Sequence, residues 1–258
     1  MRIPLILLAC LVAAALAAPA LAPYAPDQLD LAHRRVPPSA SHWFGTDDLG
    51  RDVLARVLYG ARVSLAVGLL SAAVAGASGI AVGGIAGYAG GPIDAVLMRG
   101  TDAMLAVPRL PLLMIAGSVL QPSVVLLVVL IGLAGWMETA RVVRAEFLTL
   151  KTRGFVEGAR AAGAGHARLI AVHLLPNAAQ AVIVSLTLAV ARGILIESAL
   201  SFFGVGVRPP QASWGNMLYQ AQSTLATEPW LAFAPGLFIL ITTLSVNLAG
   251  DRLAARRT

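Results

Sequence analysis

Long apolar runs separated by short polar segments make up most of the chain. A helix needs roughly 20 apolar residues to cross about 30 Å of hydrocarbon. Runs near this length cover residues 3–22, 63–88, 103–120, 124–137, 178–203 and 230–248. The third and fourth runs are divided by Gln121, Pro122 and Ser123, which predicts a short turn between antiparallel helices. The pattern predicts an all-α, polytopic membrane protein with about six transmembrane helices.

Composition agrees with lipid as the solvent of these helices. Hydrophobic residues make up 58% of the chain and charged residues only 12%, whereas soluble globular domains average about 25% charged residues. The net charge of +6 comes from basic residues that lie between the apolar runs and form no continuous stripe. This distribution is typical of the positive-inside bias of membrane proteins and argues against nucleic-acid binding. Cys10 is the only cysteine, so the chain cannot form an intrachain disulfide.

The first run has two interpretations. Met1 and Arg2 before an apolar stretch that ends in Ala20, Leu21 and Ala22 resemble a cleavable signal peptide. We favour an uncleaved helix, because the run is long enough to span and further spans follow. Six spans with the N-terminus inside place both termini and the loop 141–176 in the cytoplasm, the side that then carries more of the basic residues.

The predicted organisation is a single transmembrane domain over residues 1–258. It consists of a first helix or signal-like segment (1–22), an outer loop with an interfacial helix (23–61), a five-helix core (62–250) and a cytoplasmic tail (251–258). Within the second run Gly79, Gly83 and Gly87 recur every four residues. Such a strip lets another helix approach closely in lipid, and we interpret it as packing within the same chain.

Residues 155–177 form a polar-flanked segment rich in alanine and glycine. Glu157 suits the N-terminus of a short helix because of the helix dipole. Gly163 suits the left-handed conformation that ends a helix, and Pro176 is tolerated in the first turn of the following span. These residues predict a helical hairpin that is either a docking element for a partner or a plain connecting loop.

The same segment resembles the EAA loop of ABC-importer permeases. The resemblance implies that the loop seats in a groove of a cytoplasmic ATP-binding subunit. It differs from the usual pattern at Gly158, where alanine is common, and at His173, where isoleucine is common. By this resemblance the coupling residues are Glu157, Gly158, Ala159, Ala161, Gly163, Leu175 and Pro176.

Three further segments, at residues 42–62, 197–215 and 247–251, resemble the C-type permeases of dipeptide, oligopeptide and nickel importers. The resemblance implies a heterodimer with a B-type permease and a periplasmic or lipid-anchored substrate-binding protein. It also implies an inner-membrane location and di- or oligopeptides as substrates, with nickel chelates as the alternative. The outer motif that carries part of this resemblance comprises Gly45, Thr46, Asp47, Gly50, Arg51 and Asp52.

The outer motif also has a physical interpretation. Thr46 or Asp47 can cap a helix, after which Leu49, Val53 and Val57 fall on one face. Asp48 with Arg51, and Asp52 with Arg56, are spaced for ion pairs along a helix. We expect an amphipathic helix at the outer membrane interface, with its charges either solvated or placed near the entrance for delivered substrate.

Two charged residues fall within the fifth run. A charge at mid-bilayer costs roughly 2.5–3.5 kcal/mol on insertion scales, so Arg192 and Glu197 should face protein or water. Their spacing of five residues does not favour a pair on one helix face. We interpret Arg192 as a contact to the translocation path or to an acid of the partner permease, with backbone carbonyls as the alternative. Arg109, between two prolines, is expected to extend toward the cytoplasm.

The motifs for ATP binding and catalysis are absent from the sequence. Lys151 is the only lysine and follows Leu150, so the chain has no Gly-Lys-Ser/Thr phosphate loop. The four histidines are scattered, and we expect no metal, cofactor or catalytic site in this chain. The competing classes are an ion-gradient-driven transporter, for which Glu197 is the one acidic candidate, and an intramembrane enzyme, which lacks a nucleophile–base pair.

Overall fold

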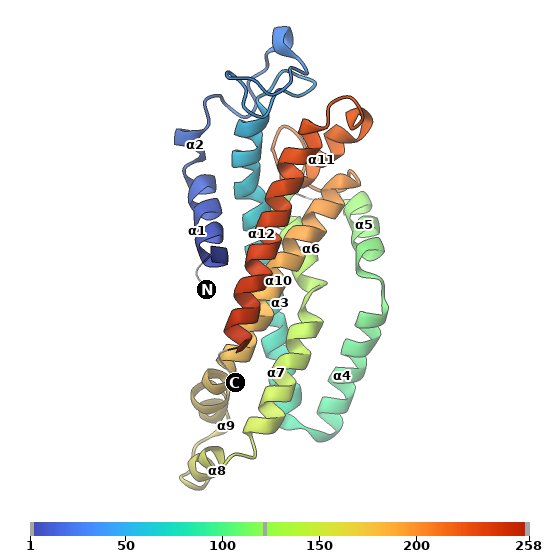
Figure 1. Cartoon of the computed structure of the whole chain (residues 1–258). Helices are drawn as coiled ribbons and strands as arrows, with labels where there is room; N and C mark the ends of the chain where they lie inside the picture. The colour runs from blue at the N-terminus through green and yellow to red at the C-terminus, as the bar shows by residue number, and fades with distance from the viewer. Residues whose placement is uncertain (1–2, 121–122, 256–258) are drawn as a thin grey trace.

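The computed structural model describes residues 3–120 and 123–255, and its regular structure is helical throughout these ranges. The all-α, polytopic architecture predicted from the apolar runs is confirmed. The helices stack side by side into an elongated bundle (Figure 1). The long segment before α3 lies at one end beside α11 (the α11 end), and α8 and α9 lie at the other (the α8 end).

Three helices are long and apolar enough to cross a membrane: α3 (Val53–Ala89), the continuous helix His166–Phe202 and α12 (Trp230–Ala255). Two bent pairs raise the number to five if each pair forms one span. The pairs are α4 (Gly91–Ala106) with α5 (Arg109–Leu120), and α6 (Val124–Leu133) with α7 (Trp136–Leu150).

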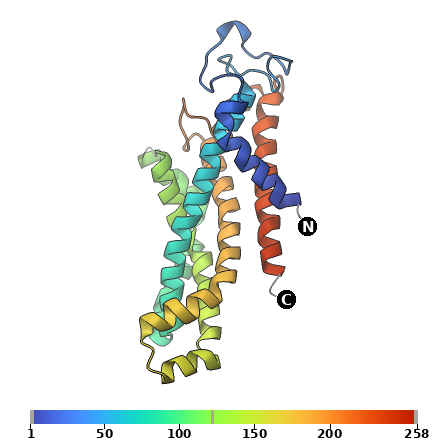
Figure 2. The same cartoon turned by 90° about the vertical axis from the view of Figure 1, so that its left-hand side faces the viewer.

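The first apolar run does not form the single long helix that we predicted. It divides into α1 (Ile3–Leu16) and the short α2 (Ala18–Leu21). Pro19 explains the break, because proline has no N–H to donate and its ring clashes with the carbonyl four residues earlier. α1 packs against α12 and α3 and flanks only part of their length (Figure 2).

The third and fourth runs are also more broken than predicted. Pro108 separates α4 from α5, and the two helices meet at an angle of 78° because the residue before a proline is forced out of the helical conformation. The fourth run bends by 43° near Gly135 and continues to Leu150 instead of ending at Met137. Within the predicted turn between the two runs, Gln121 and Pro122 lie outside the described residues, as do the last residues of the predicted tail, 256–258.

The glycine strip of the second run packs against α7 of the same chain, as predicted. A Cβ added to Gly83 would lie 2.2 Å from the carbonyl oxygen of Ala140, and one added to Gly79 would lie 2.7 Å from the carbonyl oxygen of Trp136. Small residues therefore let the backbones of α3 and α7 touch.

Apolar clusters hold both ends of the bundle. At the α11 end, the fully buried Trp214 packs with residues of α3 and α12. At the α8 end, Phe147 of α7, Val156 of α8 and Leu174 share one buried cluster. The hairpin around α8 is therefore joined to the bundle by its own hydrophobic core.

Candidate functional site

α8 (Gly154–Ala161) presents an exposed surface of small and polar residues at its end of the bundle. Val156 is the one fully buried side chain of this helix, and Ala159 packs partly against the same core. Glu157 lies in the first turn, where its charge suits the helix dipole. Glu157, Gly158 and Ala161 are exposed and free for contact with a partner.

Gly163 ends α8 in the left-handed conformation, as the sequence predicts. Its φ is +84°, and its N–H donates to the carbonyl of Arg160 at 3.0 Å. The N–H of Ala164 donates to the carbonyl of Ala159, also at 3.0 Å. These two bonds make a Schellman motif, which satisfies carbonyls at the helix end and reverses the chain.

Pro176 lies in the first turn of α10, as predicted, but α10 does not begin as a separate span. α9 (His166–Arg168) continues through the π-helical turn Leu169–Leu174 into α10 (Leu175–Phe202). In that turn the N–H of Leu175 donates to the carbonyl of Ile170 five residues earlier. The wider π turn accommodates a proline, whose missing N–H would break a regular α-helical ladder.

Two polar contacts tie the hairpin to the end of α3. The Tyr88 hydroxyl lies 2.5 Å from Nδ1 of His166 at the start of α9. Lys151, just before α8, donates from Nζ to the carbonyl of Gly87 at 3.0 Å. A displacement of the hairpin would therefore act directly on α3.

A charge cluster joins α5, α7 and α10. Arg109 donates from Nη2 to Oε1 of Glu138 at 2.5 Å, and Nη1 of Arg192 lies 3.3 Å from the same oxygen. Arg109 thus pairs with Glu138 instead of extending toward the cytoplasm as predicted. Arg192 has an acidic partner in its own chain, which we did not foresee. Sequence reasoning missed Glu138 because the fourth run was ended at Met137, one residue short of it.

Arg192 and Glu138 also line a cavity of about 440 Å³ between α7 and α10. The cavity follows one face of each helix, and its wall extends to Ala254 near the end of α12. Gln180 and Ser185 are uncharged polar residues among a largely aliphatic lining. Because Arg192 lines this cavity, its side chain is positioned to contact a solute or a partner chain there.

Glu197 is fully buried within the chain and has no surface exposed for a path or partner contact, which corrects that assignment. Ser64 of α3 donates to Oε2 at 3.0 Å, and Ser201 donates to Oε1 at 2.8 Å. The Ser64 hydroxyl also accepts from the N–H of Trp214 at 3.2 Å. Glu197 therefore fastens α3, α10 and the start of α11 (Trp214–Ala221) to one another.

The outer motif forms a compact polar loop and not a separate interfacial helix. α3 begins only at Val53, where Asp52 caps the helix by accepting from the N–H of Ala55 at 2.8 Å. Asp52 binds His42 at 2.9 Å and does not pair with Arg56 as expected. The segment before Asp52 stays out of the helix because Gly45 and Gly50 adopt left-handed φ values of +74° and +75°.

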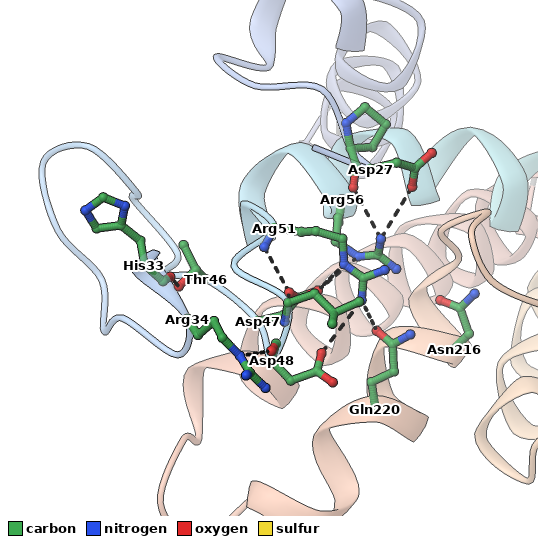
Figure 3. A network of polar contacts seen from close by, with 12 residues as sticks. Asp27, His33, Arg34, Thr46, Asp47, Asp48, Arg51, Arg56, Asn216 and Gln220 are labelled. Carbon is green, nitrogen blue, oxygen red and sulfur yellow. Dashed lines mark hydrogen bonds and ion pairs between the residues drawn. The ribbon is translucent and has the colours of Figure 1, made fainter. Parts of the chain in front are cut away.

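Asp47 is the centre of this loop (Figure 3). Its carboxylate accepts from the N–H groups of Leu49 and Arg51, and Oδ2 accepts from Nε of Arg51 at 2.7 Å. Arg56 is only 1% exposed, and its Nε lies 3.7 Å from the same oxygen. Thr46 donates to the carbonyl of His33. Arg51 reaches Gln220 of α11 at 3.4 Å, so the motif locks the long N-terminal segment onto the bundle.

Comparison with known proteins identifies the family of the chain. Residues 79–258 match the family described as binding-protein-dependent transport system inner membrane component. The chain belongs to this family. It is a multi-pass permease subunit of an ATP-driven importer in the inner membrane, and a transport protein rather than an enzyme.

Sequence matches to several named permeases cover most of this chain. The chain is 41% identical over 251 residues to a protein of Brucella suis biovar 1 (strain 1330) named as a candidate peptide permease, covering 96% of this chain and 83% of that protein. It is 39% identical over 236 residues to the dipeptide transport system permease protein DppC of Bacillus subtilis (strain 168), covering 91% and 74% respectively. The oligopeptide permease protein OppC of the same organism is 37% identical over 249 residues, covering 96% and 82%.

The fold is similar to that of a crystal structure of an amino acid ABC transporter with histidines. The TM-score is 0.55 at 16% sequence identity, and the match covers 80% of this chain and 95% of that chain. At this identity the likeness concerns the fold alone.

Proposed function

We propose that this permease subunit imports di- or oligopeptides and is driven by separate ATP-binding subunits that bind the hairpin of α8 and α9. The peptide substrate is supported by the names of the relatives that match nearly the whole chain. The ATPase contact is supported by the hairpin itself. Its coupling residues Glu157, Gly158, Ala161 and Gly163 are exposed, while Val156 anchors the helix in the bundle.

The same proposal includes two further partners and an orientation. A B-type permease would supply the other wall of the path, and a periplasmic or lipid-anchored binding protein would deliver peptide at the α11 end. The α8 end and both termini would then lie in the cytoplasm. Residues predicted to be outer, such as Asp47 and Arg51, lie at the opposite end from α8, which is the arrangement that this orientation requires.

A bulky substitution on the hairpin tests the ATPase contact. We expect Ala161→Trp to lower both the recovery of ATP-binding subunits with the purified complex and the ATP-dependent uptake of peptide. Thr152→Trp is the matched control, because Thr152 is also exposed at this end but precedes α8. Normal recovery and normal uptake with Ala161→Trp would contradict the assignment of the hairpin as the ATPase-binding element.

Cysteine labelling tests the orientation. Replacing Cys10 by serine gives a cysteine-free chain, into which single cysteines are introduced at Thr152 and Ser41, both exposed. A membrane-impermeant thiol reagent should label position 41 in intact spheroplasts and position 152 only after lysis. The reverse pattern would overturn the orientation while leaving the fold unaffected.

A further inference from the structure

Arg192 belongs to a charge cluster that carries more positive than negative charge. Arg109 and Arg192 approach one oxygen of one carboxylate, at 2.5 Å and 3.3 Å from Oε1 of Glu138. Arg109 is the closer partner and the more covered of the two, with its side chain 22% exposed against 38% for Arg192. Arg192 is therefore the second arginine on a carboxylate oxygen that already accepts from Arg109.

The guanidinium of Arg192 does not bind Glu138 in the two-bond geometry that suits a carboxylate best. Two parallel bonds between a guanidinium and both carboxylate oxygens make the strongest such pair. Here Arg192 reaches only Oε1, and Oε2 of Glu138 is buried with no hydrogen-bond partner. The planar fork of Arg192 thus retains capacity for a second carboxylate that can bind in the two-bond geometry.

The cavity beside Arg192 has the size and lining of a small-ligand site. Its volume of about 440 Å³ lies within the range of roughly 300–1,000 Å³ that is common for ligand pockets. On α7 the lining residues Glu138, Val142, Ala145 and Glu146 follow helical spacing along one face. The site is a hollow between α7 and α10 whose polar lining residues are Glu138, Glu146, Gln180, Ser185 and Arg192. Arg192 is the one cation among these lining residues, so it is the group that can bind an anionic solute there.

The position of Arg192 in α10 strengthens this interpretation. A charged side chain within a membrane span is costly and commonly marks a substrate path. Arg192 lies well inside α10, ten residues before its end at Phe202 and 17 residues after its start at Leu175. The cavity continues from this level toward Gln180 and Ala254, and thus toward the α8 end.

We infer that Arg192 binds a carboxylate of the transported solute, and that Glu138 is its counter-ion while the cavity is empty. Arg109 holds Glu138 in place, so the incoming carboxylate takes over Arg192 without leaving Glu138 unpaired. The inference rests on the proposed function, since it assigns the C-terminal carboxylate of a peptide to this subsite. It predicts a preference for peptides with a free C-terminus.

Uptake of a matched pair of peptides tests the subsite. The complete transporter in proteoliposomes is given one dipeptide with a free C-terminus and the same dipeptide with a C-terminal amide. We expect Arg192→Gln to lower uptake of the free acid at least about tenfold, the effect of losing a hydrogen bond to a charged group. Uptake of the amide should change less than about twofold, and Arg192→Lys should restore part of the preference.

The controls separate a solute contact from a structural one. Arg99→Gln removes a positive charge from an exposed position of α4 and should leave the ratio of the two uptake rates unchanged. If Arg192→Gln lowers both uptake rates equally and reduces recovery of the partner permease, Arg192 pairs with an acid of that partner and the inference is overturned. An unchanged ratio with an intact complex also overturns it. If the wild-type transporter takes up neither peptide, the proposed substrate class is wrong as well.

Discussion

Ser64 and Glu197 lie 133 residues apart in the sequence and are joined by a buried hydrogen bond of 3.0 Å. The bond links α3 to α10, and the carboxylate is 0% exposed. A buried carboxyl group is tolerated only where hydrogen bonds compensate for lost water. Here the hydroxyls of Ser64 and Ser201 supply them, one at each carboxylate oxygen.

Removal of the Glu197 carboxylate should therefore destabilise the bundle. Glu197→Ala leaves both serine hydroxyls without their acceptor and opens a cavity, and each unsatisfied buried group costs about 1–3 kcal/mol. We expect a clear fall in the thermal unfolding temperature of the detergent-solubilised subunit. Glu197→Gln keeps the shape and one oxygen acceptor and should cost less. Equal stability of Glu197→Ala and wild type would contradict the structural role.

Two glycines of the hairpin should respond in opposite directions to alanine. Gly163 has a left-handed φ of +84°, so Gly163→Ala should cost about 1 kcal/mol and loosen the end of α8. Gly158 lies within α8 with open space around its Cβ position, so Gly158→Ala should stabilise the helix by about 0.5–1 kcal/mol. Hydrogen exchange of the α8 amides measures both changes. Faster exchange in Gly158→Ala would contradict the helix assignment.

The close packing of α3 against α7 is tested by substituting two neighbouring glycines of α3. A Cβ at Gly83 would lie 2.2 Å from the backbone oxygen of Ala140, whereas one at Gly84 would meet Phe147 at an ordinary 3.4 Å. Gly83→Ala should cost about 1–3 kcal/mol by forcing the helices apart, and Gly84→Ala should be nearly neutral. Thermal unfolding of the two single variants makes the comparison. The packing would be contradicted if Gly84→Ala proved the more damaging change.

The outer motif offers a pair of neighbouring aspartates with different burial. Asp47 and Arg51 form a buried pair at 2.7 Å, with side chains 8% and 6% exposed. Asp47→Asn removes one partner of that pair and should cost about 3–5 kcal/mol. Asp48 is 50% exposed and 3.8 Å from Arg51, so Asp48→Asn should change stability by less than about 1 kcal/mol.

Limited proteolysis of the segment before α3 measures the outcome at Asp47. We expect cleavage near residues 30–50 to become faster in Asp47→Asn and to stay at the wild-type rate in Asp48→Asn. Equal rates for the two variants would mean that the charge of Asp47 does not hold the segment on the bundle.

The outer motif and the fourth apolar run show where sequence reasoning reached its limit. Helical spacing suggested that Asp52 pairs with Arg56, but glycine conformations at Gly45 and Gly50 keep the preceding segment out of the helix. Asp47 instead gathers Arg51, four residues later, and Arg56, nine residues later, although residues 47–52 are not helical. Glu138 was not predicted as a site residue because the apolar run ends at Met137, where polar residues begin, although α7 continues to Leu150.

The sequence by itself determined the membrane environment, the helical class and the hairpin. These follow from local properties: the length of apolar runs, the spacing of small residues and the left-handed preference of Gly163. Only the tertiary structure decided which charges meet. Arg109, Glu138 and Arg192 come from three helices, and the burial of Glu197 depends on Ser64 of a fourth. Such contacts depend on how helices cross in space, which hydrophobic periodicity does not encode.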